Sequence, residues 1–128
     1  MIVEDDADGR EALRSLLELL GHEVEVAENG EQGIELTLAH RPEVVLLDIG
    51  MPSMNGYEVA HRIRKAPGGN VPYLVALTGW SRFEDHRRAR EAGFDTYVLK
   101  PAEPDHLQAL LAAAPNGSSN KGIRQTPR

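Results

Sequence analysis

Four short apolar stretches of this chain each end on a hydrophilic residue, and this pattern constrains the fold more than any other feature. The pairs are Met1-Ile2-Val3 with Glu4-Asp5, Val44-Val45-Leu46-Leu47 with Asp48, Leu74-Val75-Ala76-Leu77 with Thr78, and Tyr97-Val98-Leu99 with Lys100. If the stretches are strands of one parallel sheet, their carboxyl ends all point the same way, and ligands bind outside those ends. Three acids, a hydroxyl and an ammonium group are then expected at one edge of the sheet.

Helical patterns separate the apolar stretches. Leu13, Leu16, Leu17 and Leu20 recur on one face of a helix expected from about Ala7 to Leu20, and Asp8 with Glu11 predicts a capping box-like start. A short strand is expected at about Glu23 to Ala27. Further helices are predicted after Asn29-Gly30 and up to Pro42, at Gly56 to Lys65, at Phe83 to Ala92, and at Pro104 to Ala114.

Strands that alternate with helices predict an α/β fold, because right-handed crossovers place helices on both faces of a parallel sheet. The expected architecture is a doubly wound, flavodoxin-like (βα)5 domain. Its five parallel strands, counted along the chain, take the order 2-1-3-4-5, with the switch point between the first and third strands. We expect this domain over residues 1–114, and a disordered tail or linker stub over residues 115–128, which have almost no apolar content.

Composition limits the classes of function. The 128 residues carry a net charge of −6, which gives no general affinity for nucleic acid or for anionic membranes, and no apolar run approaches the ~20 residues of a membrane helix. There are no cysteines, so disulfides and thiolate metal sites are excluded. With no secretory signal visible, we expect a cytoplasmic protein. An arginine cluster on the helix 83–92 and directly before it favours a protein interface over nucleic acid; it comprises Arg82, Arg87, Arg88 and Arg90.

The predicted switch point brings Glu4, Asp5 and Asp48 together. Three crowded carboxylates repel unless a cation or a shared proton intervenes, and we favour a hard divalent cation. Magnesium takes one or two carboxylates and keeps sites for water and phosphate oxygens, which matches this set. Lys100 and Thr78 suit the oxygens of a phosphoryl group, and a carboxylate beside Mg²⁺ can be the nucleophile.

Each of these residues has an ordinary structural explanation when it is taken alone. Acidic runs such as Glu4-Asp5-Asp6 more often cap helices, Tyr97 is most often simple packing, and Lys100 before Pro101 is usually a solvated strand end. The functional interpretation depends on their joint occurrence at equivalent positions of the predicted sheet.

Together these residues resemble the response-regulator receiver domains of two-component signalling. The motifs that carry the resemblance are Glu4-Asp5-Asp6, Leu47-Asp48-Ile49-Gly50-Met51-Pro52 with Gly56, Leu77-Thr78-Gly79, and Tyr97-Val98-Leu99-Lys100-Pro101. The match runs from Met1 to about Ala114. The chain looks most like the terminal receiver of a hybrid sensor kinase or a single-domain response regulator. Receivers normally carry several residues before the first acids, whereas Met1 falls inside the first expected strand.

The resemblance implies a role for each residue of the cluster. Asp48 would be the phosphoacceptor, and Mg²⁺ would be held by Asp5 directly, by Asp48, by the Gly50 carbonyl, and by Glu4 largely through water. Thr78 and Lys100 would bind the phosphoryl group. Thr78 and Tyr97 would form the conformational switch.

The resemblance also implies partners and a kind of activity. The phosphoryl donor would be a phosphohistidine on a sensor histidine kinase or a phosphotransfer protein. The domain would act as a signalling switch, not an enzyme, and would catalyse only its own phosphorylation and dephosphorylation. Its signal would reach an unknown downstream protein through helix 83–92, the strand that ends at Lys100, and helix 104–114. The same face would serve a homodimer, and the resemblance gives no direct contact with nucleic acid or membrane.

Two other functions remain open at this stage. One is a Mg²⁺-dependent phosphatase or phosphotransferase that acts on small molecules through an aspartate nucleophile. Such enzymes place Asp-x-Asp after the first strand, whereas this chain has Glu4-Asp5-Asp6 there and is too short for a cap domain. The other is a receiver-like interaction module that is not phosphorylated. Such modules lose the acids or the lysine, whereas this chain keeps them.

Overall fold

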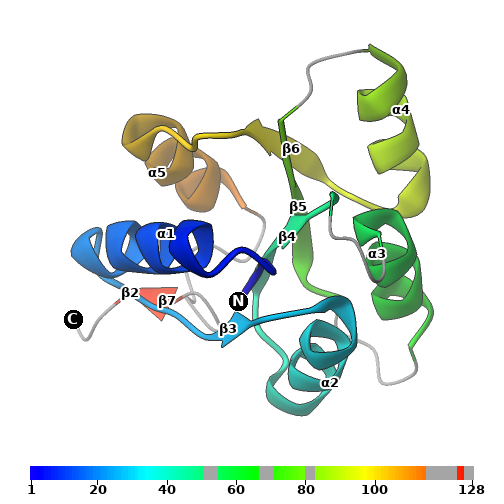
Figure 1. Cartoon of the computed structure of the whole chain (residues 1–128), viewed down its shortest axis with the longest axis horizontal. Helices are drawn as coiled ribbons and strands as arrows, with labels where there is room; N and C mark the ends of the chain where they lie inside the picture. The colour runs from blue at the N-terminus through cyan, green and yellow to red at the C-terminus, as the bar shows by residue number, and fades with distance from the viewer. Residues whose placement is uncertain (51–54, 67–70, 80–82, 115–123, 126–128) are drawn as a thin grey trace.

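The computed structural model describes residues 1–50, 55–66, 71–79, 83–114 and 124–125 (Figure 1). Along the chain its elements are β1 Ile2–Val3, α1 Ala7–Leu19, β2 His22–Glu23, β3 Val26–Ala27, α2 Gly30–His40, β4 Val44–Asp48, α3 Gly56–Lys65, β5 Tyr73–Thr78, α4 Phe83–Ala92, β6 Thr96–Leu99, α5 Pro104–Ala113 and β7 Arg124–Gln125. Met51 and Pro52 of the receiver-like motif and Arg82 of the arginine cluster lie outside the described residues.

Five of the strands form one parallel sheet in the order β3-β1-β4-β5-β6. Numbered by the five predicted strands, this order is 2-1-3-4-5, so the flavodoxin-like prediction is confirmed. Helices α1 and α5 cover one face of the sheet, and α2, α3 and α4 cover the other (Figure 1). The switch point lies between β1 and β4, where Ile2 pairs with Leu46 and Val3 with Leu47.

The core consists of two clusters, one on each face of the sheet. Successive residues of a strand point to opposite faces, so Val45 and Leu47 of β4 pack toward α2, α3 and α4, whereas Val44 and Leu46 pack toward α1 and α5. All five residues of β4 are buried. Burial on both faces explains why this strand is a continuous apolar run that ends abruptly at an acid.

Helix α1 begins differently from the prediction. Its N-cap is Asp6, whose side chain accepts a hydrogen bond of 2.8 Å from the Gly9 N–H, so the expected capping box-like start at Asp8 and Glu11 is wrong. Asp6 is the better cap because it has extended backbone angles directly before the first helical residue. The helix ends before Gly21 as predicted, and that glycine has a φ of 97°, which favours a residue without Cβ.

The strand expected at about Glu23 to Ala27 is divided in two. Only β3 joins the main sheet, and β2 pairs antiparallel with β7, with His22 opposite Gln125. Of the tail predicted over residues 115–128, all but Arg124–Gln125 lies outside the described residues. Among the helices of the described chain, none is long and apolar enough to cross a membrane.

Candidate functional site

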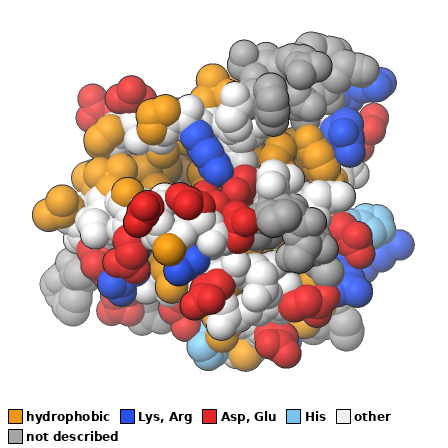
Figure 2. Space-filling model, viewed as in Figure 1, with side chains coloured by type: hydrophobic (Ala, Val, Ile, Leu, Met, Phe, Trp, Pro, Cys, Tyr) orange, Lys and Arg blue, Asp and Glu red, His pale blue; other side chains and the backbone are white. Residues whose placement is uncertain are grey.

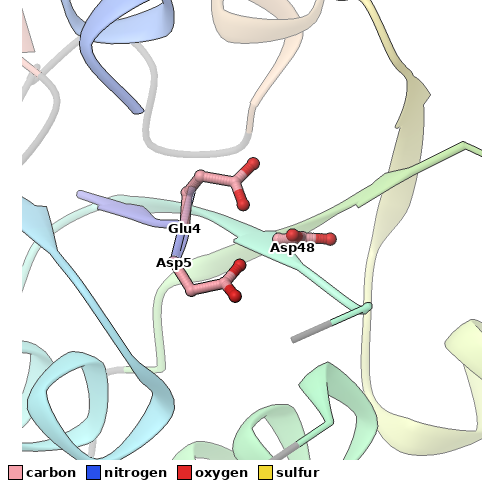
Figure 3. A group of neighbouring side chains, drawn as sticks. All are labelled: Glu4, Asp5 and Asp48. Atoms are coloured by element: carbon pink, nitrogen blue, oxygen red, sulfur yellow. The ribbon is translucent and has the colours of Figure 1, made fainter. Parts of the chain in front are cut away.

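The three acids singled out in the sequence come together at the carboxyl edge of the sheet. Glu4 and Asp5 directly follow β1, and Asp48 is the last residue of the neighbouring β4. Each offers a carboxylate oxygen, and these three oxygens lie within 4.8 Å of one another (Figure 3). In the space-filling view, acidic side chains gather over the start of α1 and around this edge of the sheet (Figure 2).

Glu4 is held by the sheet and by the turn into α1. Its backbone N–H donates to the Ala27 carbonyl at 3.1 Å, which extends the pairing of β1 with β3 by one residue. Its carboxylate accepts a bond of 3.4 Å from the Asp6 N–H. Glu4 is only 4% exposed, whereas the adjacent Asp5 is exposed. The pair therefore offers a metal ion one buried and one accessible carboxylate oxygen.

Asp48 is fixed from its C-terminal side. The Gly50 N–H donates to Asp48 Oδ1 at 2.9 Å, which orients the carboxylate at the end of β4. Behind it, a Cβ on Gly56 would lie 2.9 Å from the Asp48 carbonyl oxygen and 2.6 Å from Ile49 Cα. Helix α3 therefore begins in direct contact with the backbone that carries Asp48, and this contact requires a glycine.

Lys100 reaches both buried acids from the end of β6. Its Nζ lies 3.0 Å from Glu4 Oε1 and 3.1 Å from Asp48 Oδ2. Its backbone N–H donates to the Thr78 carbonyl at 2.8 Å, so the same residue extends the pairing of β6 with β5. The ammonium group thus partly neutralises the acidic cluster.

The close contacts shift the ionisation of the cluster. Burial raises the pKa of Glu4 to about 7, and the Asp48 carboxylate adds to this effect more than Lys100 offsets it. Burial alone would also raise the pKa of Asp48, but hydrogen bonds from Glu4, Gly50 and Lys100 outweigh it and bring the pKa below its ordinary value. The Asp48 carboxylate is therefore the group of the pair that stays ionised at neutral pH.

The donor set fits a magnesium ion. Magnesium binds oxygen ligands at about 2.1 Å in octahedral geometry, so two ligands on opposite sides of the ion lie about 4.2 Å apart. The three carboxylate oxygens lie within 4.8 Å of one another, so a small movement of the side chains would bring them to the ligand spacing of one ion. Glu4, Asp5 and Asp48 are the residues that would hold the ion.

The other predicted site residues lie on the same side of the fold. Thr78 ends β5, is 3% exposed, and follows Leu77, the pairing partner of Asp48. Gly50 is exposed, two residues after Asp48. Tyr97 is half-buried on β6, where it packs against the core cluster under α2, α3 and α4, and it is not part of the acidic cluster. Sequence reasoning did not single out Asp6 as the N-cap of α1 or Glu4 as a partner of Lys100.

A groove of about 410 Å³ opens beside the acidic cluster. Glu4, Asp6 and Lys100 line its polar end, and α1 contributes the apolar side chains Leu13 and Leu16. The groove lies between α1 and the segment that leads from Lys100 to Ala102, and it gives a second molecule apolar surface next to the acids.

Comparisons with known proteins agree with this architecture. Residues 1–112 match the model of the response regulator receiver domain family. The response regulator MprA from Mycolicibacterium vanbaalenii is 35% identical over 113 residues, which cover 88% of this chain and 48% of that protein. A CheY-like receiver domain protein from Methanospirillum hungatei has a TM-score of 0.77 at 28% identity, covering 92% of this chain and 94% of that one.

A third similar structure is the receiver domain of a Saccharomyces cerevisiae response regulator, solved with its histidine phosphotransfer protein. It has a TM-score of 0.80 at 24% identity, covering 88% of this chain and 85% of that one, and it shows the shared fold. The chain belongs to the response regulator receiver domain family, whose members are signalling switches of two-component systems. It spans about half the length of several curated relatives that it matches.

Proposed function

We propose that this domain is a phosphorylation-dependent switch in which Asp48 is the phosphoacceptor. The observation that carries the proposal is the position of Asp48: its carboxylate is oriented by the Gly50 N–H and lies beside two acids and a lysine. In the reaction, the bond between phosphorus and a histidine nitrogen of the donor breaks. A bond from phosphorus to an Asp48 carboxylate oxygen forms, and the imidazole keeps the electron pair.

Each neighbour of Asp48 has a part in this reaction. When bound, Mg²⁺ would neutralise charge on the phosphoryl oxygens, and its ligands would be Asp5, Asp48, the Gly50 carbonyl and Glu4. Lys100 would exchange its contact with Asp48 for a phosphoryl oxygen. Thr78, at the end of the adjacent strand β5, would donate its hydroxyl to the same group.

The signal would pass through a population shift in the fold. The phosphoryl group makes contacts with Thr78 and Lys100 that exist only in one state, and it thereby favours that state. We assign Tyr97 as the second switch residue because it lies half-buried on β6, which Lys100 follows. The output face comprises α4, β6 and α5. On it, Leu99 is 41% exposed and lines a hollow of about 540 Å³ with Tyr97 and His106, a surface suited to a downstream protein or a second copy.

The phosphodonor in this proposal is a sensor histidine kinase or a histidine phosphotransfer protein in the cytoplasm. The yeast receiver of the same fold was solved with such a phosphotransfer protein. The apolar groove beside the acids offers a docking surface that a protein donor would use and a small phosphate ester would not need.

Phosphorylation of the purified domain by acetyl phosphate and Mg²⁺, followed by intact mass, tests the proposal. We expect one added phosphoryl group that hydroxylamine removes, as it does from acyl phosphates. The product should be absent in Asp48→Asn and retained in the control Asp8→Asn, which changes an exposed acid of α1. Unchanged phosphorylation of Asp48→Asn would show that another residue is the acceptor. Rapid turnover of a generic phosphate ester would support the phosphatase alternative.

A further inference from the structure

The turn between β1 and α1 holds its shape through an arginine that the proposed reaction does not use. Arg10, on the first turn of α1, donates from its guanidinium to the Glu4 carbonyl oxygen at 3.0 Å. Its backbone N–H donates to the Asp6 carbonyl at 2.9 Å. The second bond is the ordinary i→i−4 bond of the first helical turn, so the guanidinium bond to Glu4 is the contact specific to arginine.

The Arg10 guanidinium donates a hydrogen bond to a backbone carbonyl although several carboxylates are close to it in the sequence. Asp5, Asp6 and Asp8 all lie within five residues of Arg10, yet none of the salt bridges within the described residues involves it. Arg14, one turn further along α1, behaves in the usual way for an exposed arginine: it pairs with Glu11 at 3.1 Å and with Glu18 at 3.9 Å. The half-buried Arg10 side chain is thus directed to the backbone of the acidic turn.

The carbonyl that Arg10 binds has a particular position in the site. It belongs to the peptide group between Glu4 and Asp5, and a peptide group is planar. The orientation of this plane sets the directions in which the two acidic side chains leave the backbone. A charged donor on the carbonyl, stronger than a neutral one, fixes the plane and with it the spacing of both carboxylates from Asp48.

We propose that Arg10 is a positioning residue for the magnesium site, acting through the Glu4 carbonyl. This inference rests on the proposed function, which assigns Glu4 and Asp5 as magnesium ligands. Arg10 contributes by holding the two acids in the arrangement in which their oxygens and that of Asp48 lie within 4.8 Å. Residues that orient metal ligands typically change metal affinity by 10- to 100-fold when they are replaced.

The direction in which Mg²⁺ affinity changes when Arg10 is removed distinguishes a positioning role from a purely electrostatic one. A positive charge next to a cation site weakens cation binding, so if Arg10 acted only through its charge, its removal would strengthen Mg²⁺ binding. If Arg10 positions the acids, its removal weakens Mg²⁺ binding although a repulsive charge has been lost.

Calorimetric titration of the metal-free protein with Mg²⁺ tests the inference in Arg10→Met and in Arg14→Met. The second variant removes the same charge from the same helix without touching the turn. We expect Arg10→Met to lower Mg²⁺ affinity about 10-fold and Arg14→Met to leave it unchanged. Arg10→Lys, which keeps a charged donor, should recover part of the loss. Equal affinities in Arg10→Met and Arg14→Met, or tighter binding in Arg10→Met, would overturn the inference.

Two further measurements keep the test decisive. Thermal unfolding of each metal-free variant shows whether it is folded; if Arg10→Met is not, Arg10→Lys is compared with Arg14→Lys, and equal affinities then overturn the inference. The wild-type titration tests the proposed function separately. If wild type binds Mg²⁺ and Asp48→Asn binds it more weakly, the magnesium site stands whatever Arg10 does, whereas absence of binding in wild type refutes the site itself.

Discussion

Substitution of Gly56 by alanine tests how tightly α3 supports the phosphoacceptor strand. A Cβ at this position would lie 2.6 Å from Ile49 Cα, 2.8 Å from Ile49 Cγ2 and 2.9 Å from the Asp48 carbonyl oxygen. Two of these three atoms belong to the backbone, so rotation of a side chain cannot relieve the contacts. Gly56 does not have a positive φ, so the effect of the substitution comes from the contacts and not from backbone strain.

The magnitude follows from two opposing terms. Overpacking in a well-packed core costs about 1–3 kcal/mol. Alanine gains up to ~1 kcal/mol over glycine in a helix interior, and less at the first residue of α3. The net loss of unfolding free energy should be about 0.5–2.5 kcal/mol, which for a domain of this size corresponds to a fall of roughly 2–10 °C in Tm.

Thermal and urea unfolding would measure this loss, with Gly79→Ala as the control. Gly79 follows β5 at the same edge of the sheet, is exposed, and has no atom within 4 Å of the position of a Cβ. We expect Gly79→Ala to unfold like wild type. If Gly56→Ala were as stable as Gly79→Ala, α3 would not be in tight contact with the backbone of Asp48, and the account of how the carboxylate is positioned would be wrong.

Three further substitutions test the charges around the site and elsewhere. Lys100→Ala removes the cation between Glu4 and Asp48, so we expect its Tm without metal to be lower than that of wild type. With saturating Mg²⁺ the difference in Tm should be smaller, because the metal ion then neutralises the acids. An equal difference in Tm under both conditions would contradict the ion-pair account. Asp5→Asn should weaken Mg²⁺ binding in calorimetry and barely change the Tm, because Asp5 is exposed; unchanged affinity would exclude it as a ligand. Burial lowers the pKa of His22 in the folded protein. As pH falls below about 6.5, the unfolded chain therefore binds a proton at His22 more readily than the folded protein does. His22 thus reduces the free energy of unfolding increasingly at acidic pH. The stability advantage of His22→Leu over wild type in urea unfolding should therefore widen from pH 8 to pH 5, and the exposed control His61→Gln should show no such trend; a constant gap would refute the assignment.

The sequence predicts most of the fold because its signals are local and strong. The continuous apolar run of β4 and the periodic leucine face of α1 are clear signals, and the predicted ends of α1 and α4 are followed by glycines with positive φ, Gly21 and Gly93. The start of α1 was less predictable. Asp6 and Asp8 are both acceptable caps by residue type, and only the backbone angles show that Asp6 is the N-cap.

The sequence predicted which residues meet at the site, but not the individual hydrogen bonds and ion pairs between them. Parallel strand topology predicted that Glu4, Asp5 and Asp48 would meet, because strand ends share one edge. The same argument placed Lys100 at this edge, but nothing in either segment specifies that its ammonium group contacts Glu4, 96 positions away. The hydrogen bond from Arg10 to the Glu4 carbonyl could not be predicted either, because every residue has a backbone carbonyl and the residue type does not show which one accepts a bond.

The most direct test of the central claim is a titration with Mg²⁺ and then with beryllium fluoride, a mimic of the acyl phosphate, followed by the fluorescence of Trp80, the single tryptophan of the chain. The account predicts a saturable response in wild type that requires both Mg²⁺ and Asp48 and is lost in Asp48→Asn. A response that persists in Asp48→Asn, or no response in wild type together with no acetyl phosphate labelling, would contradict the claim that Asp48 is the phosphoacceptor of a magnesium-dependent switch.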